Sequence, residues 1–156
     1  MNVTHEFESV YYFAYGSNMN PERMRERGAH FTQIERYALK GYALKFNKAS
    51  SKEPGHGCAN IVADENCVVE GVLYKINVAG LYNLDRHEGY PVEYDRVRLI
   101  FELNGSEETV KTYMANPGKT REGLYPSRSY IEHLLKAREF LSEDYYRYIK
   151  SIETLD

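Results

Sequence analysis

The sequence predicts one α+β domain over residues 1–156, built on an antiparallel or mixed β-sheet with enough strands to curl into a small barrel. Segments with strand character outnumber helical segments in the first two thirds of the chain, and helical patterns close it. The length of 156 residues suits a single domain with a real core. No internal repeat, low-complexity tract or domain-scale linker divides the chain.

The first predicted elements are a short strand and a short helix joined by a sharp turn. Residues 11–15 are aromatic and favour a strand, which Gly16 breaks. A helix over 20–28 follows, with Asn20 at its N-cap and Gly28 as its stop. Such a junction leaves backbone N–H groups unpaired beside the positive end of the helix dipole, and these attract anions. The loop is therefore predicted either to hold a carboxylate of a small substrate or to be a capped surface turn.

The middle of the chain alternates strands with polar turns. The predicted elements are a strand over 31–47 with a bend or bulge at Gly41, a polar loop over 48–57 that is a lid or a connection, a strand over 59–63, a turn at 64–66 and a strand over 67–77.

The two cysteines, Cys58 and Cys67, flank the turn predicted at 64–66. A hairpin there would place Cys67 opposite Asp64 and Cys58 nearer Leu73, which argues against a disulfide between them. Two cysteines alone make no zinc site. Both are predicted to be reduced packing residues.

The second half of the chain is predicted to add two strands and three helices. These are a helix over 78–88 stopped by Gly89, strands over 92–103 and 107–116 joined at Asn104-Gly105, a loop over 117–126, a helix capped by Ser127 or Ser129, and a helix capped by Ser142. In the last helix Tyr145, Tyr148, Ile149 and Ile152 form a stripe that indicates core packing.

Charge and hydropathy exclude several classes of partner. The net charge is −3, the pI is near 6.0 and no long basic run occurs, so nothing points to nucleic acid or a membrane surface. No apolar stretch approaches the ~18 residues of a membrane span. The polar N-terminal segment Met1–Ser9 is neither a signal peptide nor an anchor, which predicts a cytoplasmic setting. Fifteen tyrosines without a tryptophan suit a core that opens into a polar pocket.

Glu88 is the strongest single candidate for proton transfer. Leu81 and Leu84 place it on the buried face of its predicted helix, and it stands at the negative end of that helix. Both effects raise the pKa of a carboxyl, so Glu88 could hold or release a proton near neutral pH. The alternative is an ordinary glutamate that is exposed, or paired with Arg86 or Arg96.

Other chemistries find little support in the residue spacing. Ser17 follows a glycine at a sharp turn, but the G-x-S-x-G pattern of a nucleophile elbow is absent. The five histidines are scattered and show no H-x-x-x-H or H-E-x-x-H spacing, so no metal site is predicted. Residues 55–57 are too short for a phosphate-binding loop and lack its Lys-Ser ending.

Two segments together carry a family resemblance. Residues 12–19 read Tyr-Phe-Ala-Tyr-Gly-Ser-Asn-Met, and residues 84–90 read Leu-Asp-Arg-His-Glu-Gly-Tyr. In this order and about seventy residues apart they resemble the γ-glutamylcyclotransferase superfamily, and the resemblance extends to Pro-Ser-Arg-Ser-Tyr at 126–130. The Asn18-Met19 form and the helical tail are closer to the γ-glutamyl dipeptide branch than to the glutathione-specific branch.

The resemblance implies a small β-barrel flanked by helices that uses no cofactor and no metal. It implies release of 5-oxoproline from a small-molecule γ-glutamyl substrate, with the substrate's own α-amine attacking its γ-carbonyl, and it is compatible with a homodimer. Glu88 would be the catalytic proton shuttle. The residues implied to bind the substrate are Tyr12, Phe13, Ala14, Tyr15, Gly16, Ser17, Asn18, Tyr94 and Tyr130.

Several functions remain open at this point. A close variant removes a protective γ-glutamyl group from an acylated aminoglycoside in a butirosin-type antibiotic pathway, and another acts on ε-(γ-glutamyl)-lysine as a γ-glutamylamine cyclotransferase. A bulky cationic leaving group would need an acidic rim, for which the candidates are Glu53, Glu65, Glu93 and Asp95. A binding module that keeps the fold without the chemistry is the alternative from a different class.

Overall fold

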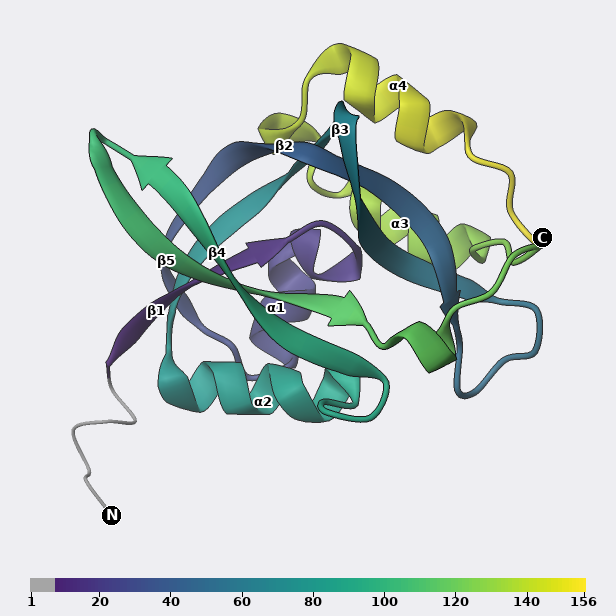
Figure 1. The fold of residues 1–156 in the computed structure, drawn as a ribbon, viewed down its shortest axis with the longest axis horizontal. Coiled ribbons are helices and arrows are strands. Elements are labelled where there is room, and N and C mark those ends of the chain that lie inside the picture. Colours follow the sequence, from purple (N-terminus) through teal and green to yellow (C-terminus); the bar gives the residue numbers. More distant parts are fainter. Residues whose placement is uncertain (1–7) are drawn as a thin grey trace.

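Five strands form one mixed β-sheet in the computed structural model, which describes residues 8–156 (Figure 1). The strands are β1 (Ser9–Ala14), β2 (Phe31–Ala49), β3 (Gly57–Asn77), β4 (Tyr94–Leu103) and β5 (Ser106–Ala115), in the order β2-β3-β1-β5-β4. Only β1 and β5 run parallel; the other neighbours are antiparallel. The predicted α+β class and mixed sheet are confirmed. Within the described residues the end strands β2 and β4 do not pair, so the sheet curls without closing.

Two sequence predictions concern the N-terminal segment and membrane spans. Most of the polar segment Met1–Ser9, on which the absence of a signal peptide was argued, lies outside residues 8–156. Among the described residues no helix has both the length and the apolar character needed to cross a bilayer.

Strands β2 and β3 form one long hairpin, and here the sequence prediction of a turn at 64–66 is wrong. β3 runs unbroken through these residues. The pairing passes from Tyr42↔Ala63 to Lys40↔Val68, so three extra residues bulge from β3 opposite Gly41. These residues still form a local turn, because the Asp64 carboxylate accepts from the backbone N–H of Asn66 at 3.0 Å. The partner strand nevertheless continues past the bulge and keeps β3 extended.

The register change also corrects the argument about the cysteines. Cys58 pairs with Lys48 on β2 rather than lying in a short hairpin with Cys67. Both thiols are free, as predicted, and both are partly buried.

Within residues 8–156, four α-helices and three 3-10 turns flank the sheet. They are η2 (Ser17–Met19), α1 (Pro21–Glu26), α2 (Val78–Glu88), η3 (Pro117–Lys119), α3 (Arg128–Leu135), η4 (Arg138–Phe140) and α4 (Glu143–Ser151). The side chains of Asn20, Asn77, Ser127 and Ser142 cap the four α-helices. α2 packs against β1 and β3, while α3 packs against η2 and α4 (Figure 1). This packing brings the end of β1 between α2 and α3.

The core lies mainly inside the curl of the sheet. Phe13, Phe101 and Leu84 are fully buried there. The predicted stripe on α4 is confirmed in part: Ile149 is fully buried, but Tyr148 is 49% exposed and does not belong to the core. The half-buried Tyr146 packs against the core instead. Tyr145 and Ile152 of the predicted stripe also pack against the core, so the packed face of α4 is shifted from Tyr148 to Tyr146.

Candidate active site

The loop after β1 is held by a buried tyrosine and closed around a glycine. Tyr74 Oη donates to the backbone oxygens of Asn18, at 2.8 Å, and Met19, at 3.2 Å. A Cβ added at Gly16 would lie 2.9 Å from Tyr130 Oη and 3.0 Å from the Ala59 Cβ. Only glycine lets the ring of Tyr130 lie this close to the loop. The turn is thus a packed internal loop and not a capped surface turn.

A small cavity of about 20 Å³ opens beside this loop. It is lined by Tyr12, Tyr15, Gly16, Ser17, Asn18, Ala59, Glu88, Tyr94, Tyr113 and Tyr130. The fold therefore brings together, from four separate parts of the chain, eight of the ten site residues named from the sequence. Ala59 and Tyr113 were missed, because nothing in their local sequence sets them apart from other strand residues.

Phe13 and Ala14 were named with this loop but do not line the cavity. Side chains alternate along a strand, so Phe13 points to the face opposite Tyr12. Its ring meets Phe101 edge-on at 5.3 Å, and its backbone oxygen accepts from Thr112 Oγ1 at 2.8 Å. Both residues are fully enclosed by protein and belong to the core.

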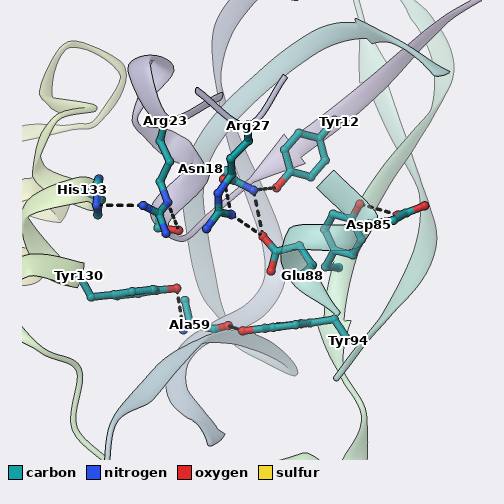
Figure 2. A network of polar contacts seen from close by, with 12 residues as sticks. Tyr12, Asn18, Arg23, Arg27, Ala59, Asp85, Glu88, Tyr94, Tyr130 and His133 are labelled. Atoms are coloured by element: carbon teal, nitrogen blue, oxygen red, sulfur yellow. Dashed lines mark hydrogen bonds and ion pairs between the residues drawn. The ribbon is translucent and has the colours of Figure 1, made fainter. Parts of the chain in front are cut away.

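Glu88 reaches the cavity from the last residue of α2. Its Oε1 accepts from Asn18 Nδ2 at 3.0 Å and from Arg27 Nη1 at 3.4 Å, and its side chain is 17% exposed (Figure 2). Burial raises the pKa of Glu88 above its usual value, against the opposing effect of Arg27 and of the Asn18 hydrogen bond. The raised pKa agrees with the direction predicted from the sequence.

The cation beside Glu88 is not one that the sequence suggested. Arg86 donates to Asn83 on its own helix, and Arg96 pairs with Asp85 at 3.5 Å. Arg27 comes instead from the end of α1, sixty-one residues before Glu88.

Two tyrosines hold the floor of the cavity through the backbone of Ala59. Tyr94 Oη donates to the Ala59 oxygen at 2.7 Å, and Tyr130 Oη accepts from the Ala59 nitrogen at 3.0 Å (Figure 2). Burial raises the pKa of both phenols, so both stay protonated at neutral pH. The backbone of Ser17 also hydrogen-bonds the Tyr130 oxygen, so the Tyr130 hydroxyl proton and the lone pairs of the Tyr94 oxygen are left for a ligand.

Within residues 8–156 no base hydrogen-bonds to the Ser17 hydroxyl to make it a nucleophile. Its Oγ accepts from Arg23 Nε at 3.1 Å, and a guanidinium cannot take a proton. Arg23 in turn lies 3.2 Å from His133 Nε2 (Figure 2). Arg23 and Arg27 were both missed from the sequence. Their four-residue spacing directly after the loop was the available signal, since it places them on one side of a short helix.

Metal-binding side chains do not gather at this site. Among the described residues no three His, Cys, Asp or Glu side chains are placed to hold a metal ion together. The groups that line the cavity are phenols, one amide, one hydroxyl and one carboxyl. This donor set suits hydrogen bonding to a small polar molecule.

Comparisons with known proteins point to one family. Residues 12–132 match the family model described as "Gamma-glutamyl cyclotransferase, AIG2-like". The bovine protein named Gamma-glutamylcyclotransferase is 32% identical over 96% of this chain and 81% of its own length, and the human protein of that name is 31% identical with the same coverage. A solved structure titled "Gamma-glutamyl cyclotransferase" superposes with a TM-score of 0.79 at 30% identity, covering 96% of this chain and 90% of that one.

Proposed function

The chain belongs to the γ-glutamyl cyclotransferase, AIG2-like family, and on that premise we propose that it converts a γ-glutamyl amide into 5-oxoproline and a free amine. One observation carries the proposal. Glu88, with its raised pKa, opens onto the same cavity as the loop Gly16–Asn18. A proton-carrying carboxyl and an anion-binding loop are the two groups that this reaction needs.

The loop is proposed to bind the α-carboxylate of the glutamyl group. Gly16 and Asn18 both line the cavity, and their backbone N–H groups are proposed to donate to a substrate oxygen. Tyr94 and Tyr130 would bound the other side of the folded glutamyl chain. Holding that chain bent brings its α-nitrogen close to its γ-carbon, and such positioning supplies a large share of the rate enhancement of an intramolecular reaction.

Glu88 is proposed to carry protons between the two nitrogens. As a carboxylate it takes a proton from the α-ammonium, which frees the nitrogen lone pair to attack the γ-carbonyl carbon. The new C–N bond closes the ring, and the bond to the departing nitrogen breaks as Glu88 returns the proton to it. Glu88 then takes a second proton from the ring nitrogen and passes it to the released amine. Of the three ammonium protons one therefore stays on the ring nitrogen and two end on the amine, which leaves as an ammonium ion. The nucleophile belongs to the substrate, so the step as proposed uses no cofactor.

The test is 5-oxoproline formation followed by mass spectrometry. The substrates are a γ-glutamyl dipeptide, ε-(γ-glutamyl)-lysine and a γ-glutamyl-acylated aminoglycoside, which also separate the dipeptide, γ-glutamylamine and antibiotic-pathway activities. Product from none of them would overturn the proposal and favour a binding module. Glu88→Gln should lower kcat by about 10²–10⁴-fold, the usual contribution of general acid–base catalysis.

Matched variants separate the roles of Glu88 and Ser17. Glu102→Gln makes the same change at an exposed position on β4 outside the cavity and should retain full activity. Equal rates in Glu88→Gln and the wild type would refute the proton shuttle. Ser17→Ala should lose activity. The wild type should accumulate no acyl-enzyme, because Ser17 is proposed to bind the substrate and not to attack its carbonyl carbon.

A further inference from the structure

A second hollow leads outward from the cavity. It has a volume of about 440 Å³ and shares Ser17, Glu88, Tyr94 and Tyr130 with the inner cavity. If the inner cavity holds the glutamyl group, as the proposed function requires, the departing amine must lie in this outer hollow. We call it the vestibule.

The vestibule is lined by more cations than carboxylates. The lysines and arginines are Arg23, Arg27, Lys48, Lys52 and Arg86, and the carboxylates are Glu53, Glu88 and Glu93. The cations exceed the carboxylates by two. Of the four acidic residues considered for a rim, Glu65 and Asp95 do not line it at all.

Ion pairs within the vestibule do not neutralise its excess positive charge. Arg27 pairs with Glu88 at 3.4 Å and Lys48 with Glu93 at 2.7 Å. Among residues 8–156, none of the three remaining vestibule cations has a carboxylate within ion-pair distance; they are Arg23, Lys52 and Arg86. Glu88 and Glu93 are thus already paired, and Glu53 offsets only one of the three unpaired cations, so the lining presents two excess positive charges to whatever enters.

Arg23 is the best placed of these cations. Figure 2 shows Arg23 and Arg27 extending side by side from α1 toward the space between Tyr130 and Glu88. The neighbours of Arg23 do not neutralise it: one is the Ser17 hydroxyl, and the other is His133.

His133 is itself flanked by two donors. Its Nδ1 lies 3.0 Å from Asn20 Nδ2 and its Nε2 lies 3.2 Å from Arg23 Nη1, yet a neutral imidazole has only one acceptor nitrogen. Asn20 cannot turn its amide around, because its Oδ1 already accepts from Glu22 N. Burial and the nearby Arg23 and Arg27 lower the pKa of His133.

The same positive field acts on the rim. Burial, followed by Arg27, Arg23, Arg86 and Lys52, lowers the pKa of His87, which lines the vestibule. A titratable group at the entrance thus responds to the three unpaired cations together.

We propose that the vestibule is a leaving-group subsite selective for acidic amino acids, so that a γ-glutamyl-glutamate type of substrate is preferred over neutral or cationic ones. The departing part of that substrate carries two carboxylates, which match the two excess positive charges of the lining. A lysine or aminoglycoside leaving group would bring like charge against Arg23, Lys52 and Arg86. The proposal rests on the proposed function and adds the identity of the leaving group to it.

The experiment compares two dipeptides of the same shape. γ-Glutamyl-glutamate and γ-glutamyl-glutamine differ by one carboxylate, and kcat/KM for 5-oxoproline release is measured for each at low salt. We expect a preference of about tenfold for the glutamate dipeptide, which corresponds to roughly one charge interaction in a partly solvated site. The preference should shrink as salt is added. ε-(γ-Glutamyl)-lysine should be the slowest substrate.

Variants assign the preference to named residues. Arg23→Gln should bring the glutamate-to-glutamine ratio close to one, whereas Arg25→Gln, the same change on an outward-facing side chain of α1 that pairs with Glu22, should keep it. Should Arg23→Gln fail to fold, the double variant Lys52→Gln/Arg86→Gln changes only exposed positions and should also lower the ratio.

The outcomes are distinguishable. A ratio of one or less in the wild type, or faster turnover of the lysine substrate, would overturn the subsite while leaving the proposed function standing. A ratio unchanged in both Arg23→Gln and the double variant would do the same. Absence of product from every dipeptide would overturn the proposed function and the subsite with it.

Discussion

Arg27 is the cation that stabilises the ionised form of Glu88, so Arg27→Gln should raise the pKa of that carboxyl. Arg27 lowers the pKa of Glu88 in the folded protein, in opposition to burial, and its removal leaves burial less opposed. If Glu88 acts first as a base, the acidic limb of the kcat/KM profile follows its pKa. The limb should therefore move to higher pH in Arg27→Gln.

The size of the shift can be worked from one distance. Arg27 Nη1 and Glu88 Oε1 lie 3.4 Å apart. Two unit charges at that separation interact by about 1.2 kcal/mol in water and by about 5 kcal/mol at an effective dielectric constant of about 20. At 1.36 kcal/mol per pH unit this spans about 1 to 3.5 units. Exposures of 15% and 17% for the two side chains admit solvent, which favours the lower part of the range, about 1 to 2 units.

The assay is a pH–rate profile of 5-oxoproline release for the wild type, Arg27→Gln and Arg25→Gln. The position of the limb is the informative quantity, because Arg27 also donates to Asn18 Oδ1 at 3.0 Å and its loss can lower the rate at every pH. Arg25→Gln removes an equal charge from the same helix and should leave the limb in place. A ¹³C titration of the Glu88 carboxyl reads the same pKa without turnover. If the acidic limb of the profile and the ¹³C titration midpoint of Arg27→Gln stay at the wild-type pH, or move to lower pH, the reasoning is refuted.

Three further predictions concern packing and capping. Gly16→Ala should abolish most activity, since its Cβ would lie 2.9 Å from Tyr130 Oη, whereas Gly118→Ala has nothing within 4 Å and should behave as the wild type in the same assay. Phe101→Ala empties a fully buried site and should cost about 3–5 kcal/mol of unfolding free energy in urea denaturation; a loss under 1 kcal/mol would show that the curl of the sheet does not depend on it. Ser142→Ala removes the N-cap of α4 and should cost about 1 kcal/mol, read as a lower thermal midpoint with the sheet intact.

Local features of the fold were predictable from short stretches of sequence. The helix over 78–88 begins and ends as expected, because Gly89 adopts the left-handed conformation with φ of 69°. Asn104 and Gly105 have φ of 52° and 83°, as the tight turn between β4 and β5 requires. Each of these outcomes is decided within a few residues, where backbone preferences and capping dominate.

Longer-range outcomes were not predictable in the same way. Asp64 and Asn66 form the local turn that their types favour, but they do not reverse the chain, because β2 offers pairing on both sides of the bulge. Tyr148 has the spacing of a core residue and lies exposed. The number of hydrogen bonds that a partner strand offers, and the face of a helix that meets the core, depend on elements far away in the sequence.

The sequence by itself determined the two segments that meet at the cavity, through the turn at Gly16 and the inward side of the helix that ends at Glu88. Only the tertiary structure decided which charges surround them. It pairs Glu88 with Arg27 and not with Arg86 or Arg96, and it lines the vestibule with an excess of cations where an acidic rim had been considered. The physical reason is that Coulomb energy depends on separation in space, and residues sixty or more positions apart acquire that separation only when the chain folds.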